Sequence, residues 1–379
     1  MSLTFIHLSD THLGFCDLDH QDEEGNYIRE QDVYKAFSDA VDIILEEKPD
    51  FVLHTGDIFH RSSPSNRTLV KAFKQISRIA SEGIPFYMIA GNHDFPKSIF
   101  TSPVHDLYKI SDLVKIVHNE ELEVISKENF SLHLLPHINS ENKFLEEVNK
   151  IKITDNSKPN ILAMHIAMPH YLMEEVGERV FPADKIDTLK DFDYTALGHW
   201  HRFNHLKKYG NVFYCGSTER TSDTQTGYEK GVIKVKIDRE TTADFIPLTL
   251  RTYEKIKVEN CWEKSTEEII AEIKSTISKE TIKNGIFHIR LIDLNEMQNN
   301  IFTRSFLEDI FEKALYYKLI KSVKGSEEKF EIDGDSFDLK EFFFDDLSEK
   351  FDGEDFTKVK NLSQKLWDEI EEEEANANQ

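Results

Sequence analysis

Side chains that could bind metal ions recur at five places within the first 201 residues of the chain. Each place lies at the end of, or just after, a short apolar run of the kind that forms β-strands, and most include a glycine. The five motifs are Asp10-Thr11-His12, Gly56-Asp57, Gly91-Asn92-His93-Asp94, His165 and Gly198-His199-Trp200-His201. In α/β proteins the loops at the carboxyl ends of strands converge on one crevice. We therefore expect these motifs to form one site.

The residue types indicate transition-metal chemistry. Imidazole with carboxylate and amide oxygens suits manganese, iron or zinc better than magnesium, which prefers oxygen ligands and keeps its waters. One carboxylate can bridge two cations about 3.5–4 Å apart, and such a pair can bind the attacking and leaving oxygens of a phosphoryl transfer. Asp57 is the candidate for this bridge. A single motif of this kind often arises by chance, but five in order favour a two-metal site.

The elements that would position these motifs alternate along the chain. Apolar runs typical of strands lie at residues 4–8, 51–54, 86–89, 130–135, 160–164, 194–197, 212–215 and 232–237. Helical periodicity covers residues 33–45 and 69–80. This alternation predicts an α/β domain, with a layered sheet between helices, over residues 1–250.

Residues 251–324 predict a small α+β domain. Strand-like runs lie at residues 256–258 and 286–292, and helical patterns at 266–277 and 302–317. An acidic linker is expected at residues 325–337, a helical segment at 338–372 and a disordered tail at 373–379. Apolar positions at helical spacing in that helical segment are Leu339, Phe342, Phe343, Leu347, Phe356, Val359, Leu366 and Ile370.

Composition limits the possible classes of protein. Hydrophobic residues make up 39% and charged residues 31%, and no apolar stretch approaches the roughly 18 residues that a membrane span needs. The three cysteines include no C-x-x-C pair, and no glycine-rich loop of the Walker type is present. The N-terminus has no secretory signal pattern. We expect a cytoplasmic, prokaryotic protein that does not bind membranes.

The formal net charge of −24 at first argues against a nucleic-acid partner, because phosphate contacts usually need a basic surface. The charge is unevenly distributed, however. Residues 326–379 contain 19 acidic and 6 basic residues, which is more than half of the imbalance. The remaining chain is only mildly acidic, so DNA stays a possible substrate.

The five motifs resemble the pattern of the calcineurin-like metallophosphoesterases, which runs D-x-H, G-D, G-N-H-[DE], H and G-H-x-H. The resemblance spans about residues 4–237. It implies a four-layer fold, in which two β-sheets pack face to face and helices flank them. It also implies that one metal is bound by Asp10, His12, Asp57 and His201. The second metal would be bound by Asp57, Asn92, His165 and His199.

The same resemblance implies a catalytic role for His93. This histidine is expected near the scissile phosphate without binding a metal in the ground state. It could stabilise the transition state or protonate the leaving oxygen. Asp94, the next residue, is expected to orient the His93 ring.

A narrower resemblance is to the SbcD-type nuclease subunit of the DNA double-strand-break repair complex. It is carried by S-D-T-H-L-G at residues 9–14, G-D-I-F-H-R-S-S-P at 56–64 and G-S-T-E-R at 216–220. It implies that His60 helps direct a DNA end into the site, where the alternative is a surface-loop histidine. It further implies that residues 251–324 form a DNA-capping domain.

Partners are also implied by this narrower resemblance. The helices within residues 338–372 would bind the coiled-coil base of an SMC-like ATPase; the alternative is that they fold back on their own domain. A homodimer through helices of the catalytic domain is expected as well. A possible DNA contact is one basic helical stripe, for which a solvated outer face is the alternative reading, formed by Arg67, Lys71, Lys74 and Arg78.

The sequence therefore predicts a manganese-dependent DNA exonuclease and endonuclease that uses two divalent metal ions and processes DNA ends within an ATPase complex. Iron and zinc are the alternative metals. Two other functions compete with this one. The first is a phosphodiesterase or phosphatase acting on a small phosphoester, against which His60, the cap-like segment and the terminal helices argue. The second is a non-catalytic phosphoesterase-like scaffold, against which the complete ligand set argues.

Overall fold

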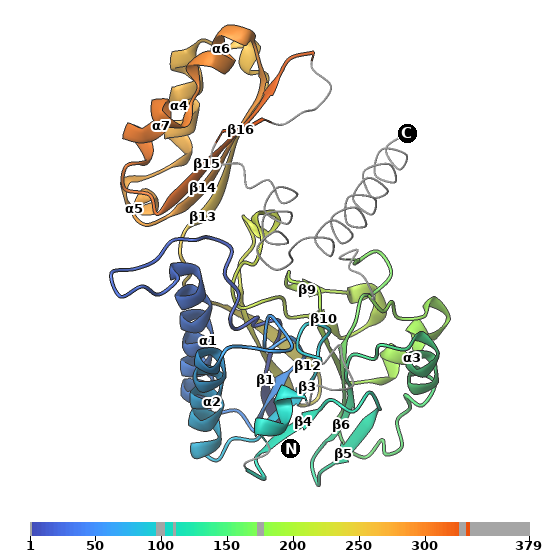
Figure 1. Ribbon diagram of the computed structural model, residues 1–379. Helices are drawn as coiled ribbons and strands as arrows, with labels where there is room; N and C mark the ends of the chain where they lie inside the picture. Colours follow the sequence, from blue (N-terminus) through green and yellow to red (C-terminus); the bar gives the residue numbers. More distant parts are fainter. Residues whose placement is uncertain (1, 96–102, 109–110, 173–177, 326–330, 334–379) are drawn as a thin grey trace, which may run out of the picture. The chain divides into compact units, whose positions relative to one another are not determined.

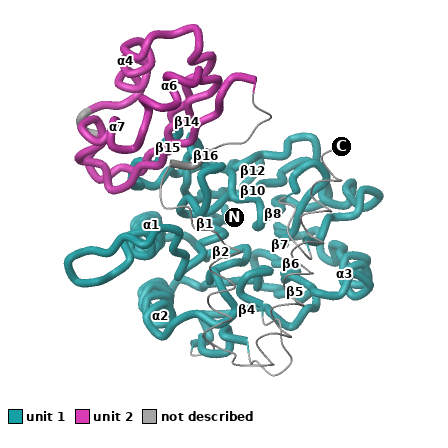
Figure 2. The backbone as a smooth tube through the Cα atoms, turned by 45° about the horizontal axis from the view of Figure 1, so that its top comes forward, with its two compact units in different colours: residues 1–255 teal, residues 256–379 magenta. Residues whose placement is uncertain are grey.

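A computed structural model describes residues 2–95, 103–108, 111–172, 178–325 and 331–333 of the chain. The chain divides into two compact units, residues 1–255 and 256–379 (Figure 2). This division lies within five residues of the domain boundary expected at residue 250. Each unit is described by itself below.

The first unit contains two six-stranded β-sheets. In the first sheet the strand order is β12-β11-β1-β2-β3-β4. Strands β1 to β4 run parallel to one another, and β11 pairs antiparallel with both β1 and β12. The strands are β1 (Leu3–Leu8), β2 (Phe51–His54), β3 (Phe86–Ile89), β4 (Val114–Val117), β11 (Gly231–Ile237) and β12 (Thr241–Pro247).

The second sheet has the order β5-β6-β7-β8-β10-β9. Its centre, from β6 to β8 and on to β10, is parallel, and its two edge strands are antiparallel. The strands are β5 (Glu123–Ser126), β6 (Ser131–Leu135), β7 (Asn160–His165), β8 (Tyr194–Gly198), β9 (Asn204–His205) and β10 (Val212–Tyr214).

The two sheets pack face to face over an apolar core. Phe5, Phe51, Ile161 and Tyr194 belong to this core, and Phe5 stacks on Phe51 with ring centroids 4.7 Å apart. Alternate residues on the same strands face outward, as the twofold period of a strand requires. Each sheet is therefore apolar on both faces and needs a second layer on its outer side.

Helices supply those outer layers. Helices α1 (Ile28–Glu47) and α2 (Asn66–Ser81) lie side by side over the outer face of the first sheet (Figure 1). Helix α3 (Glu141–Val148) and the 3₁₀ segment η2 (Ala183–Asp191) pack on the outer face of the second sheet. This arrangement confirms the predicted four-layer fold.

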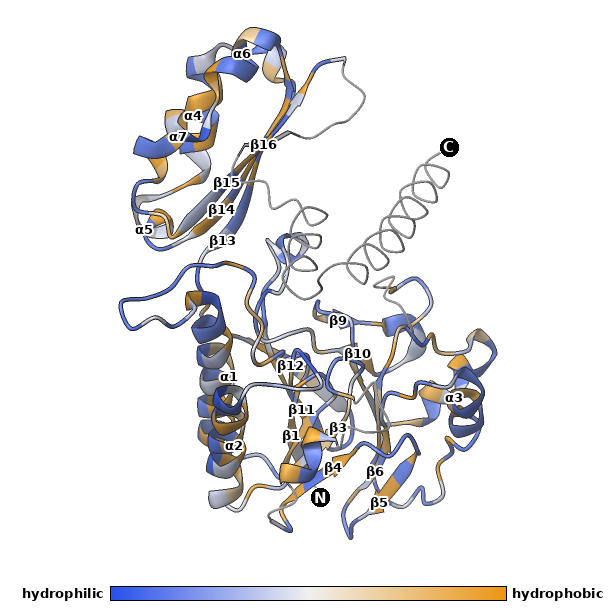
Figure 3. Cartoon of the chain, in the orientation of Figure 1, coloured by the Kyte–Doolittle hydropathy of each residue, from blue (hydrophilic) through white to orange (hydrophobic). Residues whose placement is uncertain are grey.

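The sequence explains why α1 and α2 pack as they do. Helix α1 places Val33, Phe37, Val41 and Ile44 on one buried face at spacings of three or four residues, and its outer side is mostly hydrophilic (Figure 3). Helix α2 begins after Ser65, whose side chain accepts a hydrogen bond from the Thr68 N–H. That cap fixes the end of the loop that contains His60.

The second unit is an α+β fold, as expected for residues 251–324. Strands β13 (Tyr253–Val258), β14 (Ile286–Leu294), β15 (Tyr316–Val323) and β16 (Glu331–Asp333) form one sheet in that order. Helices α4 (Thr266–Thr276) and α7 (Arg304–Phe311) contribute to one core with this sheet. The short helix α5 (Lys279–Ile282) follows α4, and α6 (Glu296–Ile301) follows β14.

Two expectations for the second unit are wrong in part. The helix expected over residues 302–317 ends at Phe311, and Tyr316 already begins β15, which pairs with its parallel neighbour β14. Residues Glu331–Asp333, expected within a linker, pair antiparallel with β15 as β16. In both places, pairing between strands that are distant in the sequence determines the structure. Local periodicity does not predict such pairing.

The remaining part of the C-terminal segment, including all eight apolar positions from Leu339 to Ile370, lies outside the described residues. Among the residues that the structure does describe, no helix is both long and apolar enough to cross a membrane.

A buried histidine between the sheets gives a test of this packing. His7 is fully buried, and its ring nitrogens lie 3.0 Å from Tyr194 Oη and 3.0 Å from Thr55 Oγ1. Burial, assisted by the nearby His54, lowers the pKa of His7 from 6.5 to about 3. Between these pH values the unfolded chain binds a proton here and the native chain does not.

We therefore expect the stability that His7 provides to be complete above pH 6.5 and to be lost as the pH falls from there toward about 3. Urea unfolding with chelator present should show the wild-type protein losing up to about 1.4 kcal/mol per pH unit relative to His7→Gln. The exposed His170 provides the control, since His170→Gln should leave the pH profile unchanged. Parallel profiles for wild type and His7→Gln would contradict this account.

Candidate metal centre

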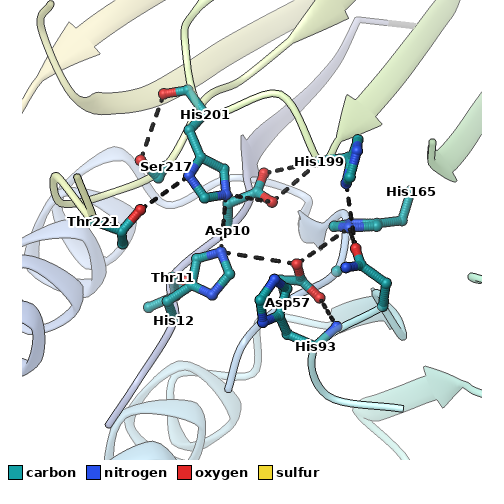
Figure 4. A network of polar contacts seen from close by, with 12 residues as sticks. Asp10, Thr11, His12, Asp57, His93, His165, His199, His201, Ser217 and Thr221 are labelled. Atoms are coloured by element: carbon teal, nitrogen blue, oxygen red, sulfur yellow. Dashed lines mark hydrogen bonds and ion pairs between the residues drawn. The ribbon is translucent and has the colours of Figure 1, made fainter. Parts of the chain in front are cut away.

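The seven predicted ligands come together at the carboxyl ends of strands from both sheets (Figure 4). The loops after β1, β2 and β3 supply one group, and the end of β7 and the loop after β8 supply the other. The first sheet contributes Asp10, His12, Asp57 and Asn92, and the second contributes His165, His199 and His201. The site therefore exists only where the two sheets meet.

The first predicted ligand set converges on one point. His12 Nε2 lies 2.9 Å from His201 Nε2, and His201 Nε2 lies 3.7 Å from Asp10 Oδ1. Asp57 Oδ2 lies 3.8 Å from His12 Nε2. Asp10, His12 and Asp57 are each at most 1% exposed.

The second set converges on the other side of Asp57. His165 Nε2 lies 3.3 Å from Asp57 Oδ2 and 2.9 Å from Asn92 Oδ1. His199 Nδ1 lies 3.3 Å from the same Asn92 oxygen. Asp57 Oδ2 thus lies between the two sets, where the predicted bridging ligand should be.

These separations fit metal coordination. Two ligand atoms each about 2.1 Å from one ion are roughly 3.0 Å apart in octahedral and 3.4 Å apart in tetrahedral geometry. The observed distances between predicted ligand atoms, 2.9–3.8 Å, bracket that interval. The donor set, imidazole nitrogens with carboxylate and amide oxygens, also suits manganese, iron or zinc. The side chains present therefore fit two divalent ions.

Outer hydrogen bonds orient three of the four histidine ligands. His165 Nδ1 donates to Thr55 O at 2.8 Å, which leaves Nε2 facing the site. His199 Nε2 lies 2.6 Å from Glu178 Oε1, and its Nδ1 faces Asn92. The outer nitrogen of His201, Nδ1, lies 3.1 Å from Thr221 Oγ1. Metal-binding histidines typically have such a partner, which fixes the ring and its tautomer.

The backbone at the site adopts a conformation that non-glycine residues rarely use. Asp10, His12, Asp57 and His199 have φ angles of +49°, +46°, +54° and +94°. Residues held in this region cost about 1–3 kcal/mol each, and such residues cluster at functional sites. Four of the seven predicted ligands therefore carry backbone strain that only the surrounding fold can maintain.

Glycines permit the loops to approach one another. Only Gly56 of the three motif glycines has a positive φ, at +99°. At Gly91 a Cβ atom would lie 2.0 Å from Asp57 Oδ1, and at Gly198 it would lie 2.1 Å from Thr55 O. The freedom of glycine to adopt a positive φ in a tight turn explains Gly56, whereas Gly91 and Gly198 are required for space.

Because the carboxylates are buried, their pKa values depend on the positive charge of neighbouring groups. Desolvation raises the pKa of Asp10 to about 6. Burial also opposes ionisation of Asp57, but the adjacent His165, followed by His12 and His93, holds the Asp57 pKa well below its usual range. Burial lowers the pKa of His165, but the adjacent Asp57 carboxylate raises it by more, so the pKa of His165 rises to about 10. Protons thus supply the positive charge that divalent ions would supply in a loaded site.

His93 lies beside the metal ligands and does not join either set. Its Nδ1 donates to the carbonyl oxygen of His60 at 3.2 Å, and its backbone N–H donates to Asp57 Oδ1 at 2.9 Å. The His93 ring stacks on the His60 ring, with centroids 5.4 Å apart and planes 21° apart. His12, His60 and His93 each bring one ligand-type atom within 4.8 Å of the others. The two candidate catalytic histidines thus lie together beside the first ligand set.

Asp94 has contacts that differ from the expectation that it orients the His93 ring. Its carboxylate accepts hydrogen bonds from the N–H groups of Ile58, at 2.7 Å, and Gly91, at 2.8 Å, and lies 3.5 Å from His105 Nε2. Asp94 is fully buried. It therefore joins the loops after β2 and β3, and the His60 carbonyl, not Asp94, contacts the His93 ring nitrogen.

The predicted basic stripe lies on α2 but is partly neutralised. Arg67 pairs with Glu30 at 3.7 Å, and Arg78 pairs with Asp42 at 2.5 Å. Lys71 and Lys74 are exposed. The proposed DNA contact at this helix remains a prediction.

The G-S-T-E-R segment that supports the narrower resemblance takes part in a buried ionic network. Arg29, only 1% exposed, lies 3.1 Å from Asp17, 3.0 Å from Asp32 and 3.9 Å from Glu219. Its Nη2 also donates to the carbonyl oxygen of Arg220 at 2.7 Å. The network connects the start of α1 to the segment that follows β10.

Comparison with known proteins agrees with this geometry. The family model described as "Calcineurin-like phosphoesterase" matches residues 3–203 of the chain, which include all seven predicted ligands and His93. The chain belongs to the calcineurin-like phosphoesterase family. The family predicted from the five motifs is thereby confirmed.

Relatives within this family are similar over most of the chain. The "DNA double-strand break repair protein Mre11" of Sulfurisphaera tokodaii is 28% identical, over 86% of this chain and 82% of the relative. The protein of the same name from Methanococcus maripaludis is 29% identical, over 83% of this chain and 91% of the relative. Among solved structures, a dimetal phosphatase from Danio rerio has 11% identity and a TM-score of 0.40, over 64% of this chain and 98% of that chain. The two relatives confirm the narrower resemblance to double-strand-break repair proteins.

The sequence did not predict several residues that lie near the candidate metal centre. Glu178, Thr221, Gln225 and Lys230 contact histidine ligands, directly or through one another. None of them lies next to a predicted ligand or in a motif with recognisable spacing. Only the folded chain, which brings the ends of separate strands together, reveals them.

The close approach at Gly91 leads to a prediction about metal binding. The added methyl group in Gly91→Ala would overlap Asp57 Oδ1, so we expect at least about a tenfold loss of affinity for divalent metal. Isothermal titration with Mn²⁺ measures this affinity. Gly83→Ala is the matched control: its φ of +76° makes alanine strained there, but no atom lies within 4 Å of the new Cβ. Equal Mn²⁺ affinity in the two variants would show that Gly91 does not position Asp57.

Proposed function

We propose that the chain is a manganese-dependent nuclease that hydrolyses DNA phosphodiester bonds at double-strand breaks by a two-metal mechanism. The observation that carries the proposal is the convergence of all seven predicted ligands around Asp57, with His93 beside them. A decayed scaffold would not be expected to retain seven ligand types together with four strained backbone positions. The similarity to the two double-strand-break repair proteins supports DNA as the substrate.

The chain's own residues have separate tasks in this reaction. Two bound divalent ions would supply Lewis acidity for the phosphate oxygens and activation of a water nucleophile. Asp57 would hold both ions at a fixed separation, and the outer partners of the histidines would keep each ligand nitrogen aimed inward. His93 Nδ1 donates to the His60 carbonyl, so a proton given to the leaving oxygen would come from Nε2 of the doubly protonated, imidazolium form of the ring.

His60 is proposed to contact the DNA end. Its ring lies between Phe15, with centroids 5.0 Å apart, and His93. A cavity of about 350 Å³ borders it, and Tyr27, Arg61 and Ser63 also line this cavity. A polar and aromatic cavity next to the catalytic histidine supports contact with a nucleotide near the scissile phosphate.

Protein partners form the second part of the proposal. We propose that residues 338–372 bind an SMC-like coiled-coil ATPase and that residues 251–324 cap the DNA site. A homodimer is supported by an apolar patch of the first unit made by α2 and the 3₁₀ segment η1 (Val104–Tyr108). Its members are Val70, Phe73 and Leu107, which are 66%, 43% and 55% exposed. Phe73 lies beside η1, since its ring centroid is 6.4 Å from that of Tyr108.

The His93→Leu variant tests the catalytic proposal. Leucine removes the imidazole but keeps all seven predicted ligands and the His93 backbone N–H that donates to Asp57, so Mn²⁺ content should stay near that of the wild type. Digestion of end-labelled linear duplex DNA should fall by about 10²-fold or more, as expected for loss of a general acid. Unchanged digestion by His93→Leu would remove this role from His93.

Metal and substrate controls belong to the same experiment. The wild-type protein should shorten the labelled strand with Mn²⁺ and stop when chelator is added. A small phosphodiester assayed in parallel separates a nuclease from an enzyme with a small substrate. Hydrolysis of the small phosphodiester alone, with metal bound and DNA intact, would reject DNA as the substrate.

The partner proposal has an independent test. Replacing Phe342 and Phe343 with glutamate should abolish association with a coiled-coil ATPase fragment, because charge on an apolar contact surface opposes its burial. Size-exclusion chromatography with light scattering measures the complex, and nuclease activity of the variant alone should stay at the wild-type level. Glutamate at Phe306, a 43% exposed aromatic residue of α7, is the matched control. A complex that survives in the double variant would assign these helices another role.

A further inference from the structure

Behind the metal ligand His201, on the side that faces away from the other ligands, lies a group of polar residues that we call the His201 support. It consists of Ser217, Thr221, Gln225 and Lys230. All four lie beyond residues 3–203, the part of the chain that the family model matches. Nothing in the five metal motifs assigns them a function.

Lys230 is the centre of the support. It is 2% exposed, and its Nζ lies 2.5 Å from His201 O, 2.7 Å from Ser217 Oγ and 2.7 Å from Gln225 Oε1. An ammonium group has three donors, so these three oxygens satisfy it completely. All three acceptors are uncharged, which makes the burial of this charge costly in comparison with a salt bridge. An apolar side chain would avoid that cost but would leave three buried oxygens without this donor, so a test of Lys230 must separate a loss of stability from an effect on the metal site.

Lys230 determines the geometry of His201 by two routes. The first is the backbone: the His201 carbonyl accepts from Lys230 Nζ and also from the Ser217 N–H at 3.3 Å. The second is the side chain of Gln225. Because Lys230 donates to the amide oxygen of Gln225, the amide nitrogen faces the other way and donates to Thr221 Oγ1 at 2.9 Å. Thr221 Oγ1 in turn lies 3.1 Å from His201 Nδ1, the nitrogen that carries the proton when Nε2 binds a metal.

The position of the His201 ring matters because its Nε2 edge faces the other predicted ligands of the first metal site. His201 Nε2 lies 2.9 Å from His12 Nε2 and 3.7 Å from Asp10 Oδ1. A metal bound there tolerates ligand displacements of only a few tenths of an ångström. His201 lies in the loop after β8, outside the regular strands, where the Ser217 N–H and the side chains behind it contact it.

We propose that Lys230 is a positioning residue for the first metal site, acting through the His201 carbonyl and the Gln225 amide. The proposal rests on the metal assignment made under the proposed function, but it does not depend on DNA being the substrate. It predicts a selective effect. Loss of Lys230 should weaken the site formed by Asp10, His12, Asp57 and His201, while the site that includes Asn92, His165 and His199 stays intact.

The test is Mn²⁺ binding to Lys230→Met in the full chain. Methionine has nearly the same length and removes only the three donors. Titration should show one of two binding steps weakened by about 10- to 100-fold, the usual effect of removing an outer contact, and the other within about threefold of the wild type. Electron paramagnetic resonance should show the signal of a coupled Mn²⁺ pair replaced by that of isolated Mn²⁺ at concentrations that fill only the tighter site.

A matched variant controls for the general effect of losing a buried lysine. Lys321 is 7% exposed in the second unit, and its Nζ donates to Asn299 O at 3.1 Å. Lys321→Met should leave both Mn²⁺ steps unchanged. A folded Lys230→Met protein that binds two Mn²⁺ ions like the wild type would overturn the proposal, and equal weakening of both steps would overturn it too.

A second variant decides the question if Lys230→Met does not fold. Gln225→Leu keeps two of the three Lys230 acceptors and removes the amide beside His201 Nδ1. The same Mn²⁺ step should weaken, by a smaller factor because the backbone route persists. Unchanged binding in both steps would overturn the proposal. Since both measurements follow metal binding, a failed nuclease assay with selective Mn²⁺ loss would reject only the DNA substrate.

Discussion

The buried carboxylate of Asp57 is the constraint on which the remaining structure of the site depends. It is 1% exposed, and an ionised carboxylate removed from water must have positive charge beside it. His165 and His12 approach its Oδ2 from two directions, at 3.3 and 3.8 Å, and the His93 N–H donates to its Oδ1. Strained backbone at Asp10 and at Asp57 itself, and the missing side chain of Gly91, follow from the same requirement, because each lets another loop reach this carboxylate.

The four-layer fold explains how such a site stays assembled. Four ligands come from the first sheet and three from the second, so the apolar core between the sheets determines the distances between the two groups. Aromatic pairs such as Phe5 with Phe51 and Phe5 with Tyr194 fill this core at centroid distances of 4.7 and 5.4 Å. Packing in a core of this density tolerates little change in volume. A substitution in this core would therefore change the distance between the two groups of predicted ligands, even though it replaces none of them.

The sequence predicted most of the buried fold, and the residues that it named as ligands lie together, but it predicted little that depends on edges or on long-range contacts. Strands β2 and β3 have the predicted bounds, because short, wholly buried apolar runs between helices are unambiguous. Strands β5 and β12 were not predicted, since their half-exposed edge positions lack that apolar pattern. Of the four residues of the His201 support, only Ser217 lies in a motif, the G-S-T-E-R segment, and the other three share no spacing with the metal motifs. The motifs predict which residues would bind the metals, whereas the contacts that orient those residues are determined by the tertiary fold.

The position of His93 shows what such tertiary contacts add to the chemistry. The carbonyl oxygen of His60 can only accept, so this contact keeps a proton on His93 Nδ1, and the proposed proton donation from Nε2 needs the imidazolium form of the ring. The backbone that fixes the tautomer therefore belongs to the residue whose side chain is proposed to meet the DNA end. A displacement of this loop by a bound substrate would change the hydrogen bond that orients the proton donor. In this proposal one loop both contacts the substrate and orients the proton donor. Ser65, which caps the start of α2, holds the far end of that loop in place.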